Sequence, residues 1–388
     1  MPDAKLQAPT LIDNQAALGE LTEKLKEKRV IALDTESDSL FSYYPKVCLI
    51  QLSAFENGDG SAIRDYLVDP LAIESITPLT DLLSQPSYEI VMHAADNDLL
   101  VLQRDFGIAV ERLFDTQLAA RILGKDKVGL AAILDEEFGV TSNKRMQRTD
   151  WGSRPLQPEQ IAYAQMDTHY LLPLREKYSA ELQSAGRWQE AQEAFSQLVD
   201  TEFEGREPSD RTMWQMKETR MLPEEYLGVL EALWQWRENE AQRRDIPPFK
   251  VMGNKALAEL AENQPATKRE LANTPHIGRA TVHRYGSQLL EMIRDGQRRP
   301  LPEPPESARP PDYRLDRKIM ARYDALRKWR TKTAEQRGVA PEIVMANATL
   351  LEVAKRSPQN LKELQKIRDI GPWKAETYGA AMLEIVKK

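Results

Sequence analysis

Two stretches in the second half of the sequence repeat one another at a fixed separation of 93 residues. Trp236-Arg237 recurs as Trp329-Arg330, and the register runs without a gap. The further matches join Pro248 to Pro341, Val251-Met252 to Val344-Met345, Leu257 to Leu350, Pro265 to Pro358, Leu271 to Leu364, Ile277-Gly278 to Ile370-Gly371 and Tyr285-Gly286 to Tyr378-Gly379. Such self-similarity is typical of a duplicated structural unit. It predicts two copies of one small helical domain, at residues 212–295 and 312–388.

Polar segments separate these copies from each other and from the rest of the chain. Residues 296–311 (GQRRPLPEPPESARPP) contain six prolines, which predicts a stiff, extended linker. The polar stretch TEFEGREPSDR (201–211) predicts the end of an N-terminal domain at residues 1–205. A chain of 388 residues is long enough for two or three domains of ordinary size.

The N-terminal domain alternates between strand and helix patterns. Three apolar, β-branched runs closed by turn formers predict strands: KRVIALDT (28–35), PKVCLIQLSAF (45–55) and DYLVDP (65–70). A predicted helix (76–85), a buried strand (88–94) and a second helix (97–106) follow. From Asp115 to about Leu198 the pattern is helical, with Pro158 suited to a helix's first turn. The order indicates a mixed α/β layer.

The net charge of −7 conceals a strong asymmetry along the chain. Residues 1–200 carry 19 basic against 32 acidic side chains, whereas residues 301–388 carry 18 against 12. An acidic front and a basic end fit a metal-loaded catalytic domain joined to a region that binds polyanions, although charge alone leaves other interpretations open. The single cysteine, Cys48, lies in an apolar run and is expected to be buried. Without a long apolar run or a secretory signal, we expect a cytoplasmic protein with no membrane partner.

Three groups of polar residues carry the candidate chemistry. Asp34 and Glu36 end a predicted strand and face the same side, because strand side chains alternate. Asp98 falls in the first turn of a predicted helix, where the helix dipole favours a carboxylate. Tyr163 and Asp167 are spaced i and i+4 on one helical face. Each group alone also fits a plain structural role: a solvated strand end, a helix cap or a hydrogen-bonded core pair. His93 is expected to be structural.

In combination these groups resemble a known set of motifs. LDTE, H-x4-D-L and Y-x3-D occur in the order of the three motifs of the DEDD 3′-to-5′ exonuclease superfamily, and the tyrosine marks its DEDDy branch. The chain is most similar to the ribonuclease D family, which it also resembles in YYPKVCLIQL (43–52), FDTQLAARIL (114–123) and RTDWGSRPL (148–156). The repeated helical domain resembles the HRDC domain.

The resemblance implies a fold and an activity. The fold would be an α/β ribonuclease H-like exonuclease domain, with a mixed sheet flanked by helices, followed by two all-α HRDC-like helical bundles. The activity would be hydrolysis of RNA from its 3′ end, releasing nucleoside 5′-monophosphates, with tRNA precursors bearing 3′ extensions as substrates and a monomer as the active form. Two Mg²⁺ or Mn²⁺ ions would be bound by Asp34, Glu36, Asp98 and Asp167, and Tyr163 would orient the attacking water.

One position departs from the family pattern. Ser37 stands where the family usually has a phenylalanine after the motif glutamate, which puts in doubt how a terminal base is held. Leu40, Phe41 or Tyr44 are the candidates to replace it.

Two further features suggest contacts with nucleic acid. A basic cluster beside the last motif is expected to contact backbone phosphate, with a solvated loop as the alternative: Lys144, Arg145, Arg148 and Arg154. In each repeat an Ile-Gly pair opens a predicted helix, whose exposed N–H groups suit a phosphate. Close packing explains that glycine equally well.

Two other functions remain open from the sequence. A 3′-to-5′ DNA exonuclease would use the same metal site, because the chemistry at phosphate does not depend on the sugar. A non-catalytic scaffold would bind nucleic acid through the helical pair, but it has no need of a costly carboxylate cluster. The sequence contains no G-x-x-x-x-G-K phosphate loop, which argues against a helicase.

Overall fold

The computed structural model describes residues 6–57, 60, 62–143, 145–200, 211–304 and 316–387. It forms two compact units that are discontinuous in sequence. One unit contains Met1–Ser37, Val47–Phe203 and Arg314–Lys388, and the other contains Asp38–Lys46 and Glu204–Tyr313. Much of the polar stretch at 201–211 and the second half of the predicted linker at 296–311 lie outside the described residues. No helix within the described ranges is long and apolar enough to cross a membrane.

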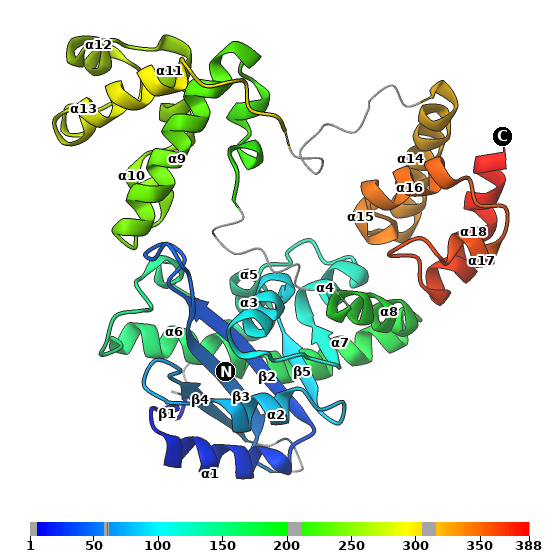
Figure 1. Cartoon of the computed structure of the whole chain (residues 1–388). Coiled ribbons are helices and arrows are strands. Elements are labelled where there is room, and N and C mark those ends of the chain that lie inside the picture. The colour runs from blue at the N-terminus through cyan, green and yellow to red at the C-terminus, as the bar shows by residue number, and fades with distance from the viewer. Residues whose placement is uncertain are drawn as a thin grey trace. The chain divides into compact units, whose positions relative to one another are not determined.

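The first unit is built on a six-stranded sheet with the strand order β1-β4-β3-β2-β5-β6 (Figure 1). Its strands are β1 (Thr10–Ile12), β2 (Val30–Ser37), β3 (Val47–Phe55), β4 (Ile63–Val68), β5 (Glu89–Met92) and β6 (Leu113–Asp115). β3 runs antiparallel to β2 and β4, while the other pairs are parallel. The expected mixed α/β class is therefore confirmed. The edge strands β1 and β6 were not predicted, because three residues are too few for a period-two pattern.

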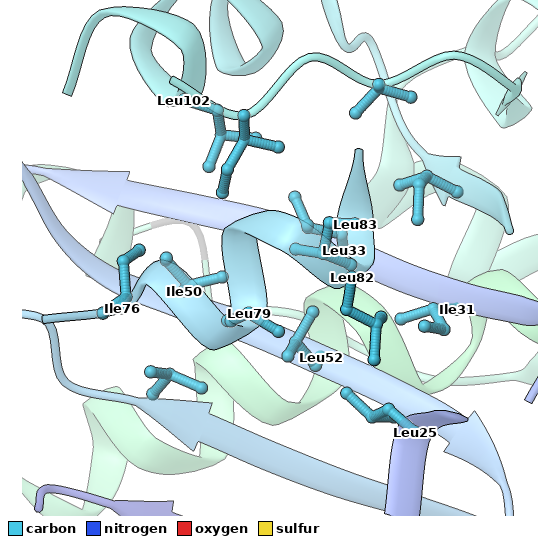
Figure 2. Packing of buried hydrophobic residues seen from close by; sticks show 14 of the residues in the cluster. Leu25, Ile31, Leu33, Ile50, Leu52, Ile76, Leu79, Leu82, Leu83 and Leu102 are labelled. Carbon is cyan, nitrogen blue, oxygen red and sulfur yellow. The ribbon is translucent and has the colours of Figure 1, made fainter. Parts of the chain in front are cut away.

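Helices cover both faces of this sheet. They are α1 (Gln15–Lys26), α2 (Thr77–Leu83), α3 (Asp96–Phe106), α4 (Thr116–Leu123), α5 (Leu130–Phe138), α6 (Pro158–His169), α7 (Leu171–Ser184) and α8 (Trp188–Val199). On one face, Leu33 of β2 and Ile50 and Leu52 of β3 pack against Leu79 and Leu82 of α2 (Figure 2). The helical pattern that begins at Pro158 divides at Tyr170 into α6 and α7, a break that the sequence analysis did not foresee.

The alternation of side chains along β2 directs its acids to the other face. Leu33 belongs to the core under α1 and α2, so Ala32, Asp34 and Glu36 point the opposite way. On that side α6 packs across β2, β3 and β4. β5 is paired with β2 only as far as Ala32, so the last residues of β2 extend beyond it. On this face the acidic end of β2 is thus covered by α6, and β5 does not pair with it.

The two helical repeats have matching elements. The first contains α9 (Leu227–Arg243), α10 (Pro248–Val251), α11 (Asn254–Asn263), α12 (Lys268–Asn273) and α13 (Arg279–Gly296). The second contains α14 (Arg317–Arg337), α15 (Pro341–Val344), α16 (Asn347–Arg356), α17 (Leu361–Leu364) and α18 (Pro372–Lys387). Corresponding arginines make the same bonds: Arg237 donates to the Met252 carbonyl and Asn254, and Arg330 donates to the Met345 carbonyl and Asn347.

The repeats differ in how they neutralise a second arginine. In the first, Arg244 donates to the Tyr285 hydroxyl, which lies 3.2 Å from Glu240 of the same repeat. In the second, Arg337 donates to the Tyr378 hydroxyl, but its carboxylate partner is Glu190 of α8, at 2.9 Å. The second repeat therefore depends on the α/β part of its unit for a buried countercharge.

A side chain of α8 also caps the start of α18. The Glu193 carboxylate accepts hydrogen bonds from the backbone N–H groups of Trp373, at 2.6 Å, and Lys374, at 3.2 Å. A Cβ atom at Gly371 would overlap the Glu193 side chain. For the second repeat, close packing is thus the reason for the glycine, and the phosphate role suggested by the sequence does not apply while Glu193 is in place.

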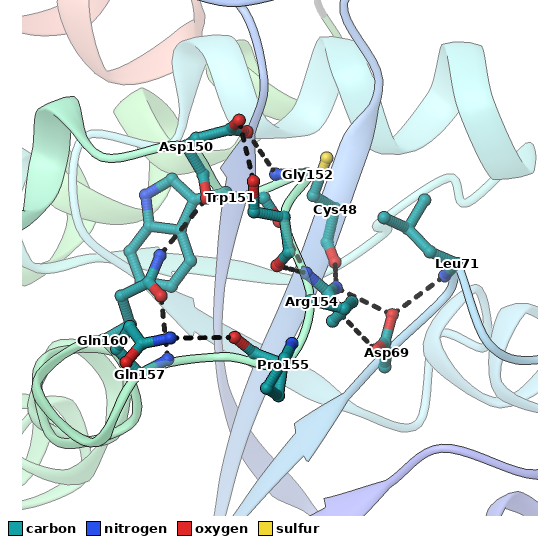
Figure 3. A network of polar contacts seen from close by, with 11 residues as sticks. Cys48, Asp69, Leu71, Asp150, Trp151, Gly152, Arg154, Pro155, Gln157 and Gln160 are labelled. Atoms are coloured by element: carbon teal, nitrogen blue, oxygen red, sulfur yellow. Dashed lines mark hydrogen bonds and ion pairs between the residues drawn. The ribbon is translucent and has the colours of Figure 1, made fainter.

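A polar network fixes the segment that leads into α6 (Figure 3). The Arg154 guanidinium donates to both carboxylate oxygens of Asp69, at 2.5 and 2.8 Å, and to the Cys48 carbonyl at 2.7 Å. At the start of α6, the Gln157 N–H donates to the Gln160 side chain, which in turn reaches the Asp150 carbonyl. The loop is thereby tied to the sheet and the first turn of α6 is set.

We predict that Arg154→Ala lowers the free energy of unfolding by about 3 kcal/mol, because Asp69 is left as a buried charge without its partner. Arg154→Lys should not restore the loss, since an ammonium cannot make the two-pronged contact. Urea unfolding measures the change. Arg148→Ala, at an exposed position of the same loop, serves as the control and should stay within about 0.5 kcal/mol of the parent. Equal stability of the alanine variants at 148 and 154 would contradict the assignment.

Candidate active site

Three of the four predicted acids meet in one place. Carboxylate oxygens of Asp34, Glu36 and Asp167 lie within 4.8 Å of one another. The first two come from the end of β2 and the third from α6, which covers that end. Asp167 is 5% exposed, so the group is enclosed on the helix side. Like charges this close require a compensating cation or retained protons.

The fourth acid, Asp98, lies beside this group. It stands in the first turn of α3, and its Oδ1 accepts a hydrogen bond from the Thr35 hydroxyl of β2. It is not among the three acids whose oxygens lie within 4.8 Å of one another. Its charge nevertheless acts on Asp34 and Glu36. The Thr35 bond links α3 directly to the acidic strand.

Asp115 supports Asp98 and was missed by the sequence analysis. Its buried carboxylate accepts hydrogen bonds at 2.8 Å from the N–H of Ala95 and from that of Leu118, and so caps α4 and fixes the residue before α3. Ala94, in the same turn, has a φ of 58°, a left-handed conformation that needs such support. The only sequence signal was its place in the family-like stretch 114–123.

Burial raises the pKa values of all four acids, and repulsion from the other site acids adds to the shift at Asp34 and Glu36. Burial, helped by Asp167 and Asp98, raises the pKa of Glu36 to about 9. Burial raises the pKa of Asp167 to about 7 and that of Asp98 to about 6. The pKa of Asp34 is raised well above its usual range by burial and by the three other acids. Hard divalent cations such as Mg²⁺ and Mn²⁺ prefer oxygen donors, so this donor set fits them.

Tyr163 lies beside Asp167 on α6. Its side chain is 5% exposed, and its hydroxyl is hydrogen-bonded to the Asp167 carboxylate. Burial and the charges of Asp167, Glu36 and Asp34 raise the pKa of Tyr163. The phenol therefore keeps its proton at neutral pH and cannot act as a free base.

The basic cluster divides into different roles. Arg145 and Arg148 are exposed in the turn before α6, and Lys144 lies outside the described residues. Arg154 departs from the expectation of a phosphate contact, because its nitrogens are engaged by Asp69 and by main-chain carbonyls. The basic neighbours of Arg154 in the sequence suggested a surface role. Its ion pair with Asp69, 85 positions away, instead gives Arg154 a structural role.

The remaining candidates lie away from metal chemistry. Cys48 is fully buried, as predicted. His93 Nδ1 lies 2.9 Å from the Thr116 hydroxyl, and burial lowers the pKa of His93 to about 4, so the ring is neutral and structural. Of the residues considered to replace the missing aromatic, Leu40 and Tyr44 are exposed, and the Lys250 ammonium lies 4.1 Å from the Phe41 ring centroid within the second unit.

Comparison with protein families matches both parts of the chain. Residues 9–183 match the family described as 3′-5′ exonuclease. Residues 227–293 and 320–386 each match the HRDC domain, at the two repeats.

Individual relatives match over nearly the full length. The chain is 30% identical to ribonuclease D of Escherichia coli K12 over 393 residues, covering 97% of this chain and 98% of that protein. It is 30% identical to ribonuclease D of Pseudomonas paraeruginosa PA7 over 379 residues, covering 97% of each. The crystal structure of Escherichia coli RNase D, described as an exoribonuclease involved in structured RNA processing, superimposes with a TM-score of 0.69 at 28% identity, covering 98% of this chain and 99% of that one. With this similarity across the exonuclease and both HRDC domains, the chain belongs to the ribonuclease D family.

Proposed function

We propose that the protein is a 3′-to-5′ exoribonuclease that hydrolyses RNA ends with two divalent ions held by Asp34, Glu36, Asp98 and Asp167. The observation that carries the proposal is the convergence of three carboxylates within 4.8 Å, with Asp98 beside them. Four ionised carboxylates carry a charge of −4, which two divalent cations balance. Membership of the ribonuclease D family supports the reaction type.

Each residue has a role that follows from its chemistry. Mg²⁺ or Mn²⁺, when bound, neutralises charge on the phosphate and lowers the pKa of the attacking water. The carboxylates bind the ions in fixed positions. Tyr163 gives its proton to the hydrogen bond with Asp167, which leaves its oxygen free to accept from a water and so to orient it.

The substrate is proposed from charge and kinship. Arg145 and Arg148, with Lys144, are proposed to contact backbone phosphate beside α6, since both described arginines are exposed. tRNA precursors with 3′ extensions are the proposed substrates, in keeping with a relative described as acting in structured RNA processing. A monomer is the proposed active form, since the proposed metal ligands and Tyr163 all belong to one exonuclease domain.

A comparison of matched RNA and DNA oligomers tests the function. With a 5′ label and Mg²⁺, the RNA should shorten one nucleotide at a time from its 3′ end, and chelation should stop the reaction. Equal or faster digestion of DNA would favour the DNA exonuclease. If both oligomers are bound and left intact, the chain is a scaffold and the proposal fails.

Asp98→Asn should lower kcat by about 10³-fold, because a charged ligand of the divalent ions is lost, and with it the firm hold on the cations that neutralise the reacting phosphate. Asp96→Asn provides a matched control, since Asp96 lies in the same helical turn but is exposed. Single-turnover cleavage of a short RNA measures both variants. If the two have similar rates, Asp98 has been assigned wrongly.

Tyr163→Phe should lower kcat by roughly 10²-fold while leaving RNA affinity unchanged. The ring still fills its buried position, and only the hydroxyl that faces Asp167 is removed. Rates and affinities are measured separately, by cleavage and by binding in Ca²⁺. Weaker binding with normal turnover would assign Tyr163 to substrate contact instead.

The acidic group also predicts opposite pH dependences with and without metal. Glu36 has an ordinary pKa of 4.5 when unfolded and about 9 when folded, so the folded state holds more protons between these values. Stability of the metal-free protein should therefore fall as the pH rises through this window. Metal binding requires ionised carboxylates, so stabilisation by Mn²⁺ should grow over the same range.

Thermal unfolding from pH 5 to 9, in chelator and in Mn²⁺, measures both slopes. Glu36→Gln is the control and should flatten the fall seen in chelator. A metal-free melting temperature that rises with pH in the parent and in Glu36→Gln alike would refute the account of the site.

A further inference from the structure

Gln51 is a polar residue in the middle of the sheet, next to the acids. It lies on β3, where its Cα pairs with Asp34 of β2 on one side and Leu67 of β4 on the other. Residues paired across antiparallel strands point to the same face, with Cβ atoms about 4.5 to 5.5 Å apart. The Gln51 side chain therefore lies alongside Asp34, under α6. It is fully buried, with 0% exposure.

The Gln51 amide has no partner in the described part of the chain. Neither Nε2 nor Oε1 makes a hydrogen bond there. A buried amide without partners costs free energy, and an apolar side chain of the same length would fit without that cost. Gln51 therefore places a hydrogen-bonding amide in the core, although the described residues make no hydrogen bond to it.

The neighbouring polar residues on the same face show the contrast. Two positions along β3, the Ser53 hydroxyl donates to Asp65 at 2.6 Å and lies 2.8 Å from that of Thr168 of α6. Asp65 also accepts from Gln165 at 2.6 Å and contacts His169 Nδ1 at 2.9 Å. This network fastens α6 to β3 and β4 and is complete without Gln51. Gln51 is thus not part of the anchor of α6.

We propose that Gln51 is a positioning residue for the metal site, donating a hydrogen bond from Nε2 to the Asp34 carboxylate when divalent ions are bound. The inference rests on the proposed function, since it assigns Asp34 to the ions. A hydrogen bond from Gln51 would fix the orientation of the Asp34 carboxylate, so that its oxygen is directed at the bound ions. Loss of such a supporting contact weakens metal affinity by about 10- to 100-fold in other metal sites.

Mn²⁺ titration of the full chain without RNA tests the inference, with free Mn²⁺ followed by electron paramagnetic resonance. Gln51→Met, which keeps the length and removes the amide, should weaken Mn²⁺ binding by about 10- to 100-fold. Its melting temperature in chelator should equal or exceed that of the parent, because a buried unpaired amide is removed. Ser179→Ala removes a buried hydroxyl on α7 that likewise has no hydrogen-bond partner among the described residues, and it should leave Mn²⁺ affinity unchanged.

The outcomes separate this inference from the proposed function. Mn²⁺ affinity of Gln51→Met within twofold of the parent overturns the positioning role, whatever happens to stability. If Gln51→Met folds poorly, Gln51→Leu is measured instead, below the melting temperature of both proteins. A parent chain that binds no Mn²⁺ overturns the two-ion proposal and this inference together, whereas normal parent binding with an unaffected variant overturns this inference alone.

Discussion

The surrounding structure has to hold four enclosed carboxylates together against their mutual repulsion. Asp34, Glu36 and Asp167 are held within 4.8 Å by segments far apart in sequence, and burial raises their pKa values. Such an arrangement persists only if each supporting element is rigid without help from the acids themselves. β2 is rigid because it lies inside the sheet, and α6 is tied by the Arg154 loop and by the Asp65 network.

Features carried by local pattern were predictable from the sequence. The acidic strand end follows from alternation, and the i, i+4 pair of Tyr163 and Asp167 follows from helical spacing. The repeat was visible because its register does not shift. For these residues, the same few sequence positions determine both the local structure and the chemistry.

Features that depend on distant partners were not predictable. Arg154 has basic neighbours in sequence, but Asp69 determines its role. Asp115 supports the start of α3 from the end of β6, a strand too short to recognise. Gln51 looked like one residue of an apolar strand, and only the register of β3 against β2 brings it beside Asp34. In each case strand pairing or loop closure, rather than propensity, supplies the missing information.

The duplicated domain shows how two copies of one sequence stop being interchangeable. In the first repeat, Glu240 supplies the negative charge beside Arg244. Thr333 occupies the corresponding position in the second repeat, and there Glu190 of α8 supplies the negative charge for Arg337. A gene in which the second copy was replaced by the first would bring a redundant carboxylate close to Glu190. An acid at position 333 would therefore duplicate the charge that Glu190 already supplies, whereas loss of Glu190 would remove the carboxylate that pairs with Arg337.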